Sequence, residues 1–175
     1  MRALLIRALQ PACLLALLLW LIPGAATATA TATVQFYDGS FECYAGTLAL
    51  RLPDTYAQLL RIGQLRRARD IRRQREHGHT TTERQLEFPG LVLRVFVFSG
   101  DPGHYEVGSV RISSPGWPLS PLRVGEARSA VALGQGWPAL PRQGSWEVQG
   151  DSAHLRVEVA AGRIAAIDYF CDPGT

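Results

Sequence analysis

Six short runs of strand-forming residues, separated by turn residues, constrain the fold of this chain more than any other feature. The runs are TERQLEF (82–88), LVLRVFVF (91–98), YEVGSVRISS (105–114), GSWEVQG (144–150), AHLRVEVA (153–160) and RIAAIDYFC (163–171). Most of them alternate apolar and polar residues, as strands with one buried face do. LVLRVFVF is almost wholly apolar, which predicts a central, well-buried strand. The Pro- and Gly-rich stretches between the runs favour turns.

The six runs form two sets of three in the same order. The matching segments are LEF (86–88) with WEV (146–148), LRV (93–95) with LRV (155–157), and VRISSP (110–115) with IDYFCDP (167–173). A helix candidate precedes each set, PDTYAQLLRIG (53–63) and VGEARSAVALG (124–134). Each candidate ends at a glycine, Gly63 or Gly134, where a C-cap would lie, and Asp54 is a candidate N-cap.

We therefore predict an α+β fold, with an antiparallel sheet built from two degenerate helix-plus-three-strand repeats and the helices packed on one face. The repeats would cover about 53–115 and about 122–173. Chance similarity between short hairpins is the alternative to an internal duplication.

The first 30 residues have the parts of a secretory signal peptide. Arg2 and Arg7 give a positive start, an apolar stretch follows, and small residues with Ala-x-Ala spacing come last. The uninterrupted apolar core, residues 12–22, is shorter than the roughly 20 residues that a membrane span needs, so an uncleaved anchor is the less favoured alternative. We predict that residues 1–30 are removed and that residues 31–175 form a single domain, periplasmic or secreted.

Two cysteines, Cys43 and Cys171, lie outside this signal segment. An exported chain folds in an oxidising compartment, where paired thiols close. We predict a Cys43–Cys171 disulfide that joins the first strand of the domain to the last. A reactive thiol pair is disfavoured, because the chain has no Cys-x-x-Cys and no histidine near either cysteine in the sequence.

Arginines are concentrated in LRRARDIRRQREHGHTTTER (65–84). Residues 61–76 hold seven arginines and two carboxylates, a net charge of +5, whereas the whole chain carries only +3. The cluster consists of Arg66, Arg67, Arg69, Arg72, Arg73 and Arg75. It could be a site for an anionic partner, such as lipid headgroups or an acidic protein face. The sequence favours a solvated helix extension or loop somewhat more, and it disfavours nucleic acid, since no aromatic residues interleave to stack bases.

The segment LRVGEARSAVALGQGWP (122–138), followed by three strands, resembles a repeat of small exported bacterial proteins. That group includes beta-lactamase-inhibitor-like proteins and the small lipoprotein of the outer-membrane assembly machine. Val124-Gly125 and Leu133-Gly134 carry the resemblance, whereas Glu126 replaces the usual Ser or Thr and Pro138 comes two residues late. The resemblance implies a layered α+β fold and a non-catalytic, protein-binding role. It transfers no partner and no binding residue.

Motifs for catalysis or metal binding are missing from the sequence. It contains no Gly-x-Ser-x-Gly, phosphate loop, His-Glu-x-x-His or dinucleotide fingerprint. His77-Gly78-His79 offers two ligands without a partner at zinc spacing. We predict no enzyme activity, no metal and no cofactor. Trp117 and Trp137, in Pro- and Gly-rich loops, are candidate interface aromatics, with cover for the edge of the core as the alternative.

These features together predict an exported, non-catalytic domain that binds an envelope protein of unknown identity. Two alternatives stay open: an inhibitor or immunity protein against one enzyme or toxin, and an envelope-surface binder of anionic ligands through the arginine cluster. A salt-insensitive partner would favour the first two functions, and steep salt dependence would favour the third.

Overall fold

The computed structural model describes residues 43–45, 47–131, 138–150 and 152–171. The predicted signal segment, Trp137 and the last residues of the second expected helix lie outside these ranges. The described residues all belong to one compact unit, residues 34–175. Within them, no helix has the length and apolar character that crossing a membrane requires.

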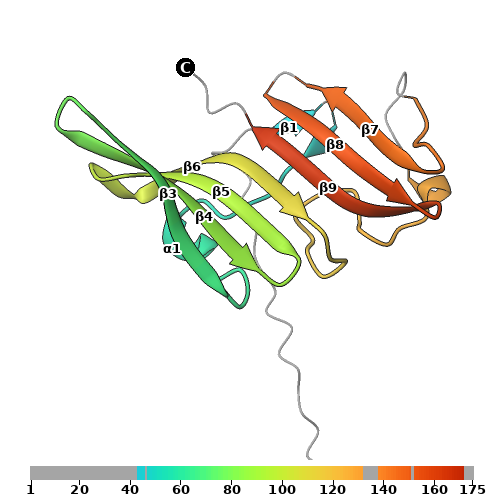
Figure 1. Ribbon diagram of the computed structural model, residues 1–175, viewed down its shortest axis with the longest axis horizontal. Helices are drawn as coiled ribbons and strands as arrows, with labels where there is room; N and C mark the ends of the chain where they lie inside the picture. Colours follow the sequence, from blue (N-terminus) through green and yellow to red (C-terminus); the bar gives the residue numbers. More distant parts are fainter. Residues whose placement is uncertain (1–42, 46, 132–137, 151, 172–175) are drawn as a thin grey trace, which may run out of the picture. The chain divides into compact units, whose positions relative to one another are not determined.

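Seven antiparallel strands form the main sheet of the described chain, in the order β3-β4-β5-β6-β9-β8-β7 (Figure 1). Their bounds are β3 Arg67–Glu76, β4 His79–Phe88, β5 Leu91–Phe98, β6 Asp101–Ile112, β7 Gly144–Gln149, β8 Ala153–Ala160 and β9 Arg163–Cys171. A small second sheet pairs β1 (Tyr44–Ala45) with β2 (Leu48–Ala49). Each of the six runs expected to be a strand forms one, because alternation lets a strand bury one face.

The predicted α+β class is wrong, since the described chain is mostly β. The helix expected over 53–63 is the single turn α1 (Tyr56–Leu59), and the described part of the helix expected over 124–134, residues 124–131, forms only a 3-10 turn, η1 (Arg128–Ala130). Thr55, not Asp54, is the N-cap of α1, where it forms a reciprocal capping box with Gln58.

The described residues of the second expected helix, 124–131, form no α-helix because their backbone groups are hydrogen-bonded at the start of β9. The Gly125 amide donates to the Ile164 carbonyl at 2.7 Å, and the Ile164 amide donates to the Glu126 carbonyl at 3.0 Å. Ala127 forms a bridge with Arg163. Nucleation of a helix is costly, so a short segment that can hydrogen-bond to the end of a strand keeps those hydrogen bonds and does not form a helix. Irregular chain, together with the small β1–β2 pair and the single turn α1, therefore covers the sheet.

The arginine-rich segment is also not a helix extension or a loop, but the edge strand β3. A two-residue turn, His77-Gly78, joins β3 to β4, with φ values of 48° and 86°. Two successive residues with positive φ suit the right-handed twist of a hairpin. Turn chemistry, rather than an apolar pattern, marks the end of β3, because all ten of its residues are exposed.

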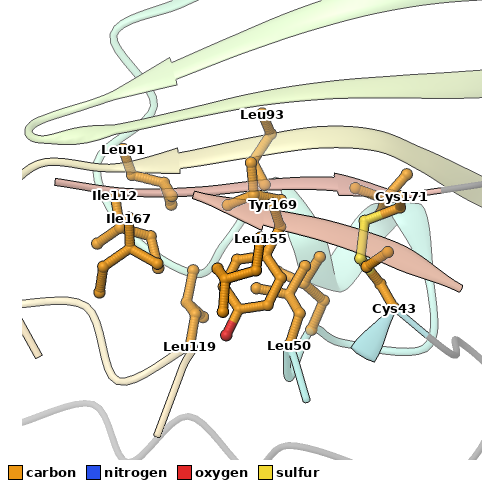
Figure 2. Close-up of a cluster of buried hydrophobic side chains, with 14 of the residues drawn as sticks. Cys43, Leu50, Leu91, Leu93, Ile112, Leu119, Leu155, Ile167, Tyr169 and Cys171 are labelled. Atoms are coloured by element: carbon orange, nitrogen blue, oxygen red, sulfur yellow. A yellow bond between two sulfur atoms is a disulfide. The ribbon is translucent and has the colours of Figure 1, made fainter. Parts of the chain in front are cut away.

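The core lies between one face of the sheet and this covering layer. Figure 2 shows Tyr169 of β9 pointing past Leu155 towards Leu119 and Leu50 of that layer. All four side chains are at most 4% exposed. The Tyr169 hydroxyl lies 2.7 Å from Ser120 Oγ, which satisfies it inside the core. Desolvation by this burial raises the pKa of Tyr169 to about 12.

The predicted disulfide is confirmed. Cys43 and Cys171 are bonded, with their Cα atoms 5.3 Å apart and 128 residues of sequence separation (Figure 2). The bond ties the chain just before β1 to the end of β9. Cys43 is 1% exposed and Cys171 is 7% exposed, so the disulfide is part of the core.

The two three-strand meanders, β4-β5-β6 and β7-β8-β9, meet where β6 pairs with β9. The pairs across this seam are Arg111↔Asp168, flanked by Val110↔Tyr169 and Ile112↔Ile167, and then Ser109↔Phe170. A two-fold axis through the Arg111↔Asp168 pair exchanges the flanking pairs. This places VRI (110–112) on IDY (167–169), the same alignment that the sequence repeat uses.

Strand registers extend the correspondence to the outer strands of each meander. The equivalent rows are Leu86↔Leu93↔Val110 and Trp146↔Val157↔Ile167. LEF (86–88) thus coincides with WEV (146–148), as aligned. Leu93 coincides with Val157 rather than Leu155, so the LRV match was displaced by two residues. The internal duplication itself stays a prediction, and β3 has no counterpart beyond β7 among the described strands.

Candidate functional site

The outward face of the sheet carries a wide depression. It has a volume of about 560 Å³, and every residue that lines it belongs to β4, β5, β6 or β9. The side chains that matter most here are those of Glu83, Arg94, Phe96, Gly108, Arg111 and Phe170. Because no covering segment contributes to its lining, this depression lies on the face opposite the core. We call it the open-face depression.

A bulge in β6 shapes the open-face depression. Arg94 pairs with Ser109 and Val95 pairs with Val107, so Gly108 is an extra residue without a partner in β5. Bulges bend a strand and increase its twist. β6 pairs with β9 only over 109–112, so the two strands separate beyond the bulge.

Gly108 also keeps the floor of the depression free beside Phe96. A Cβ on Gly108 would lie only 3.0 Å from Phe96 Cε2. Any side chain there would push the aromatic ring or fill the space next to it. The absence of a side chain at residue 108 therefore maintains the depression.

Phe170 is the main exposed apolar residue of this face. It is 47% exposed, and Ile71 on β3, at 42%, is the other large exposed hydrophobic among the described residues. The Phe170 ring stacks on His154, with centroids 5.7 Å apart. Its backbone lies opposite Ser109 across the seam. Phe170 is thus held on two sides and still open to solvent.

A charged cluster lies beside Phe170 at the seam. Arg111 Nη1 donates to both carboxylate oxygens of Asp168, at 3.0 and 2.7 Å, and its Nη2 donates to Glu158 Oε2 at 3.1 Å. Burial raises the pKa of Asp168, and the nearby Arg111 only partly offsets this. The hydrogen bond from Arg111 to Glu158 is the main cause that raises the pKa of Arg111. The cluster is internally neutralised to a large extent.

The predicted arginine patch lies at the edge of the sheet, on β3. Asp70 is its internal acceptor: Asp70 Oδ1 accepts from Arg84 Nε and Asp70 Oδ2 from Arg73 Nη2, both at 2.6 Å. These hydrogen bonds, that from Arg84 first, lower the pKa of Asp70. Arg69 donates to the neutral Gln85 at 3.2 Å. Within the described ranges the other patch arginines form no ion pair; they are Arg66, Arg67, Arg72 and Arg75.

Trp117 packs where the core meets a turn. Its Nε1 donates to the Pro89 carbonyl at 2.8 Å, and its ring meets Phe88 edge-on at 5.7 Å between centroids. A Cβ on Gly63 would lie 2.5 Å from Trp117 Cη2, so Gly63 leaves room for the indole. These contacts are those expected of a residue that covers the edge of the core. A role of Trp117 at an interface stays a prediction.

The histidine pair does not form a metal centre in the described part of the chain. His77 occupies the β3–β4 turn and His79 begins β4. Among the described residues, no group of three or more His, Cys, Asp or Glu side chains could hold an ion.

Comparisons with protein-family models, curated proteins and solved structures find no match to this chain. The resemblance to helix–meander repeats therefore stays a prediction, and the described part of the helix it requires, residues 124–131, holds only the short turn η1.

The open-face depression was missed at the sequence level. A signal for it exists in LVLRVFVF, whose outward positions include Val92 and Phe96 as well as Arg94. Outward positions of a half-solvated strand are normally polar.

Proposed function

We propose that this protein is a non-catalytic binding domain of the cell envelope that docks a partner protein on the open face of its sheet. The observation that carries the proposal is the apolar character of that face. Val92, Phe96 and Phe170 line a depression to which no described covering segment contributes. Antiparallel sheets with one solvated face usually present polar residues there, and an uncovered apolar patch is typical of an interaction site.

The charges around the depression favour an apolar side chain of the partner as the occupant. Arg111 is bonded to Asp168 at 2.7 Å, and Arg94 lies 3.9 Å from Glu83. Because these charges are balanced within the protein, the partner need not bring charges of its own. Phe170 stays about half exposed, so the depression does not enclose a small molecule in the way that ligand pockets do. A protruding apolar residue can bury Phe170 and be surrounded by a polar rim.

The disulfide supports both the location and the mode of binding. A bonded cysteine pair suits an oxidising compartment outside the cytoplasm. It also ties down the end of β9, only one residue beyond Phe170. A platform held in its binding geometry loses less entropy when a partner docks.

The test is photo-crosslinking from the open face in the native envelope. A benzophenone amino acid at position 170 should capture one protein stoichiometrically, at moderate and at high salt. The same probe at position 123, on an exposed loop arginine, should not capture it. Phe170→Ala should weaken binding of the purified partner at least about tenfold, a typical loss for an interface anchor.

Ile71→Ala is the matched control, because it removes a similarly exposed apolar side chain from β3. Equal losses from Phe170→Ala and Ile71→Ala would contradict docking at the open face. If the probe captured a second copy of this chain and sedimentation showed a dimer, the open face would mediate self-association and would not dock an envelope partner.

A further inference from the structure

We propose a second recognition surface, the free edge of β3, which binds an acidic, extended segment of a protein as an added strand. This inference goes beyond the open-face proposal and uses different residues. β3 is the first strand of the sheet order, so only β4 pairs with it among the described strands. The unpaired N–H and C=O groups of such an edge are a template for another extended chain.

The position of β3 makes its edge accessible. All ten of its residues are exposed, and the strand contributes nothing to the hydrophobic core. A bulge at Ile71 interrupts the register, but pairing with β4 is continuous from Arg72↔Glu83 to Glu76↔His79. The stretch 72–76 therefore offers a regular edge about five residues long.

The charge of β3 selects the partner. Four guanidinium groups of β3 form no ion pair within the described ranges, and neither does that of Arg66 just before it; the four belong to Arg67, Arg69, Arg72 and Arg75. Opposite charges on neighbouring strands stabilise strand pairing, and like charges oppose it. Pairing of β3 with β3 of a second copy would place arginines against arginines. An acidic segment is the complementary strand.

The arginines lie on both faces of the sheet, which favours an added strand over a flat anionic surface. Arg72 pairs with Glu83 and shares the open face, whereas Arg73 and Arg75 pair with Thr82 and Thr80 on the opposite face. A membrane surface could contact only one of these faces at a time. A strand along the edge presents side chains alternately to both, so its carboxylates can reach arginines on each side.

The test is fluorescence anisotropy with a labelled octapeptide in which two threonines separate three pairs of glutamates. The protein is purified with its disulfide formed. A control peptide has proline in place of both threonines, which keeps the charge and removes two backbone donors. We expect the threonine peptide to bind and the proline peptide to bind at least about tenfold more weakly, as strand addition requires.

Two double variants with equal charge change test the location. Arg72→Glu/Arg75→Glu should weaken binding at least about tenfold, since two attractive cross-strand pairs become repulsive. Arg123→Glu/Arg142→Glu changes two exposed arginines elsewhere and should have a small effect. Equal losses in the two variants, or equal binding of both peptides, would overturn strand addition at β3 in favour of charge alone.

Hydrogen exchange on the unmodified protein makes the test independent of the variants. The threonine peptide should protect amides of β3 and leave those of β7, the opposite edge of the sheet, unchanged. Protection of the β7 amides alone would overturn the proposal. It would also be overturned if phosphatidylglycerol vesicles bound more tightly than the peptide and displaced it. Phe170→Ala should leave peptide affinity unchanged, so failure of this surface is distinguishable from failure of the open face.

Discussion

Arg111 and Asp168 face each other across the β6–β9 seam, with Arg111 Nη1 2.7 Å from Asp168 Oδ2. They belong to one row that crosses the whole sheet: Arg67, Glu87, Val92, Arg111, Asp168, Arg156 and Glu147. Charges alternate in sign along the row except at Val92, which lines the open-face depression. Cross-strand pairs of opposite charge favour this register over shifted ones. The charged row thus aligns the two meanders and leaves one apolar gap.

Comparison of the wild type with Asp168→Asn should show that folding disfavours the ionised form of the Asp168 carboxyl group. Burial raises its folded-state pKa above the ordinary value of 3.8. The stability it contributes is therefore fully present below pH 3.8 and is lost as the pH rises through the folded pKa. The free energy of unfolding of the wild type, relative to Asp168→Asn, should fall as the pH rises. Urea unfolding from about pH 3 to about pH 6 measures this, and the opposite slope would mean that Arg111 outweighs burial.

Asp70→Asn should show the opposite trend, because hydrogen bonds from Arg84 and Arg73 lower the pKa of Asp70. The stability due to Asp70 is present above pH 3.8 and is lost as the pH falls through the folded pKa. The wild type should therefore lose stability relative to Asp70→Asn on acidification, with a small amplitude since the pair is exposed. The two variants form an internal control for the sign of each pKa shift.

Removing the disulfide should strongly destabilise the domain. The bond joins residues 128 apart in sequence, and on the chain-entropy model such a loop is worth about 5 kcal/mol. The double variant Cys43→Ala/Cys171→Ala should lower the free energy of unfolding by a similar amount. Guanidinium unfolding of the wild type with and without reductant provides a second measurement. A loss below about 1 kcal/mol in both would show that the unfolded chain is already compact.

How far the sequence predicts this fold depends on whether a strand buries one face. β5 and β8 were predicted from their apolar residues, and their register follows from the turns on either side. β3 was missed, since none of its side chains is buried and no apolar alternation exists to detect. The turn His77-Gly78 was the available signal for that hairpin.

Competition for backbone hydrogen bonds explains why the described residues 124–131 form no α-helix. The place of that segment before three strands and its closing glycine favoured a helix, but amide and carbonyl groups of its described residues bond at the start of β9, which no local pattern can indicate. The open face was missed for a related reason. An apolar run shows that both faces of a strand avoid water, and it does not show whether the protein's own chain or a partner covers the second face.

Gly108→Ala should block the open-face depression with little loss of stability. The new Cβ would lie 3.0 Å from Phe96 Cε2, so this ring, which lines the depression, must shift by a few tenths of an ångström. Partner binding should weaken by about as much as with Phe170→Ala, while the free energy of unfolding changes by less than about 1.5 kcal/mol. Titration calorimetry with the purified partner that photo-crosslinking identified measures the affinity. Urea unfolding measures the stability. Unchanged affinity would show that the partner does not reach the floor beside Phe96.

Trp117 gives a prediction that separates cover of the core from binding. Its ring packs on Phe88 and its Nε1 donates to the Pro89 carbonyl, so Trp117→Ala should lower the free energy of unfolding by about 3 kcal/mol. Trp117→Phe keeps an aromatic ring against Phe88 and loses only the hydrogen bond, so about 1 kcal/mol is expected. Phe88 belongs to the core face, so neither variant should change partner affinity at the open face. Retained stability with reduced affinity would instead identify Trp117 as an interface residue.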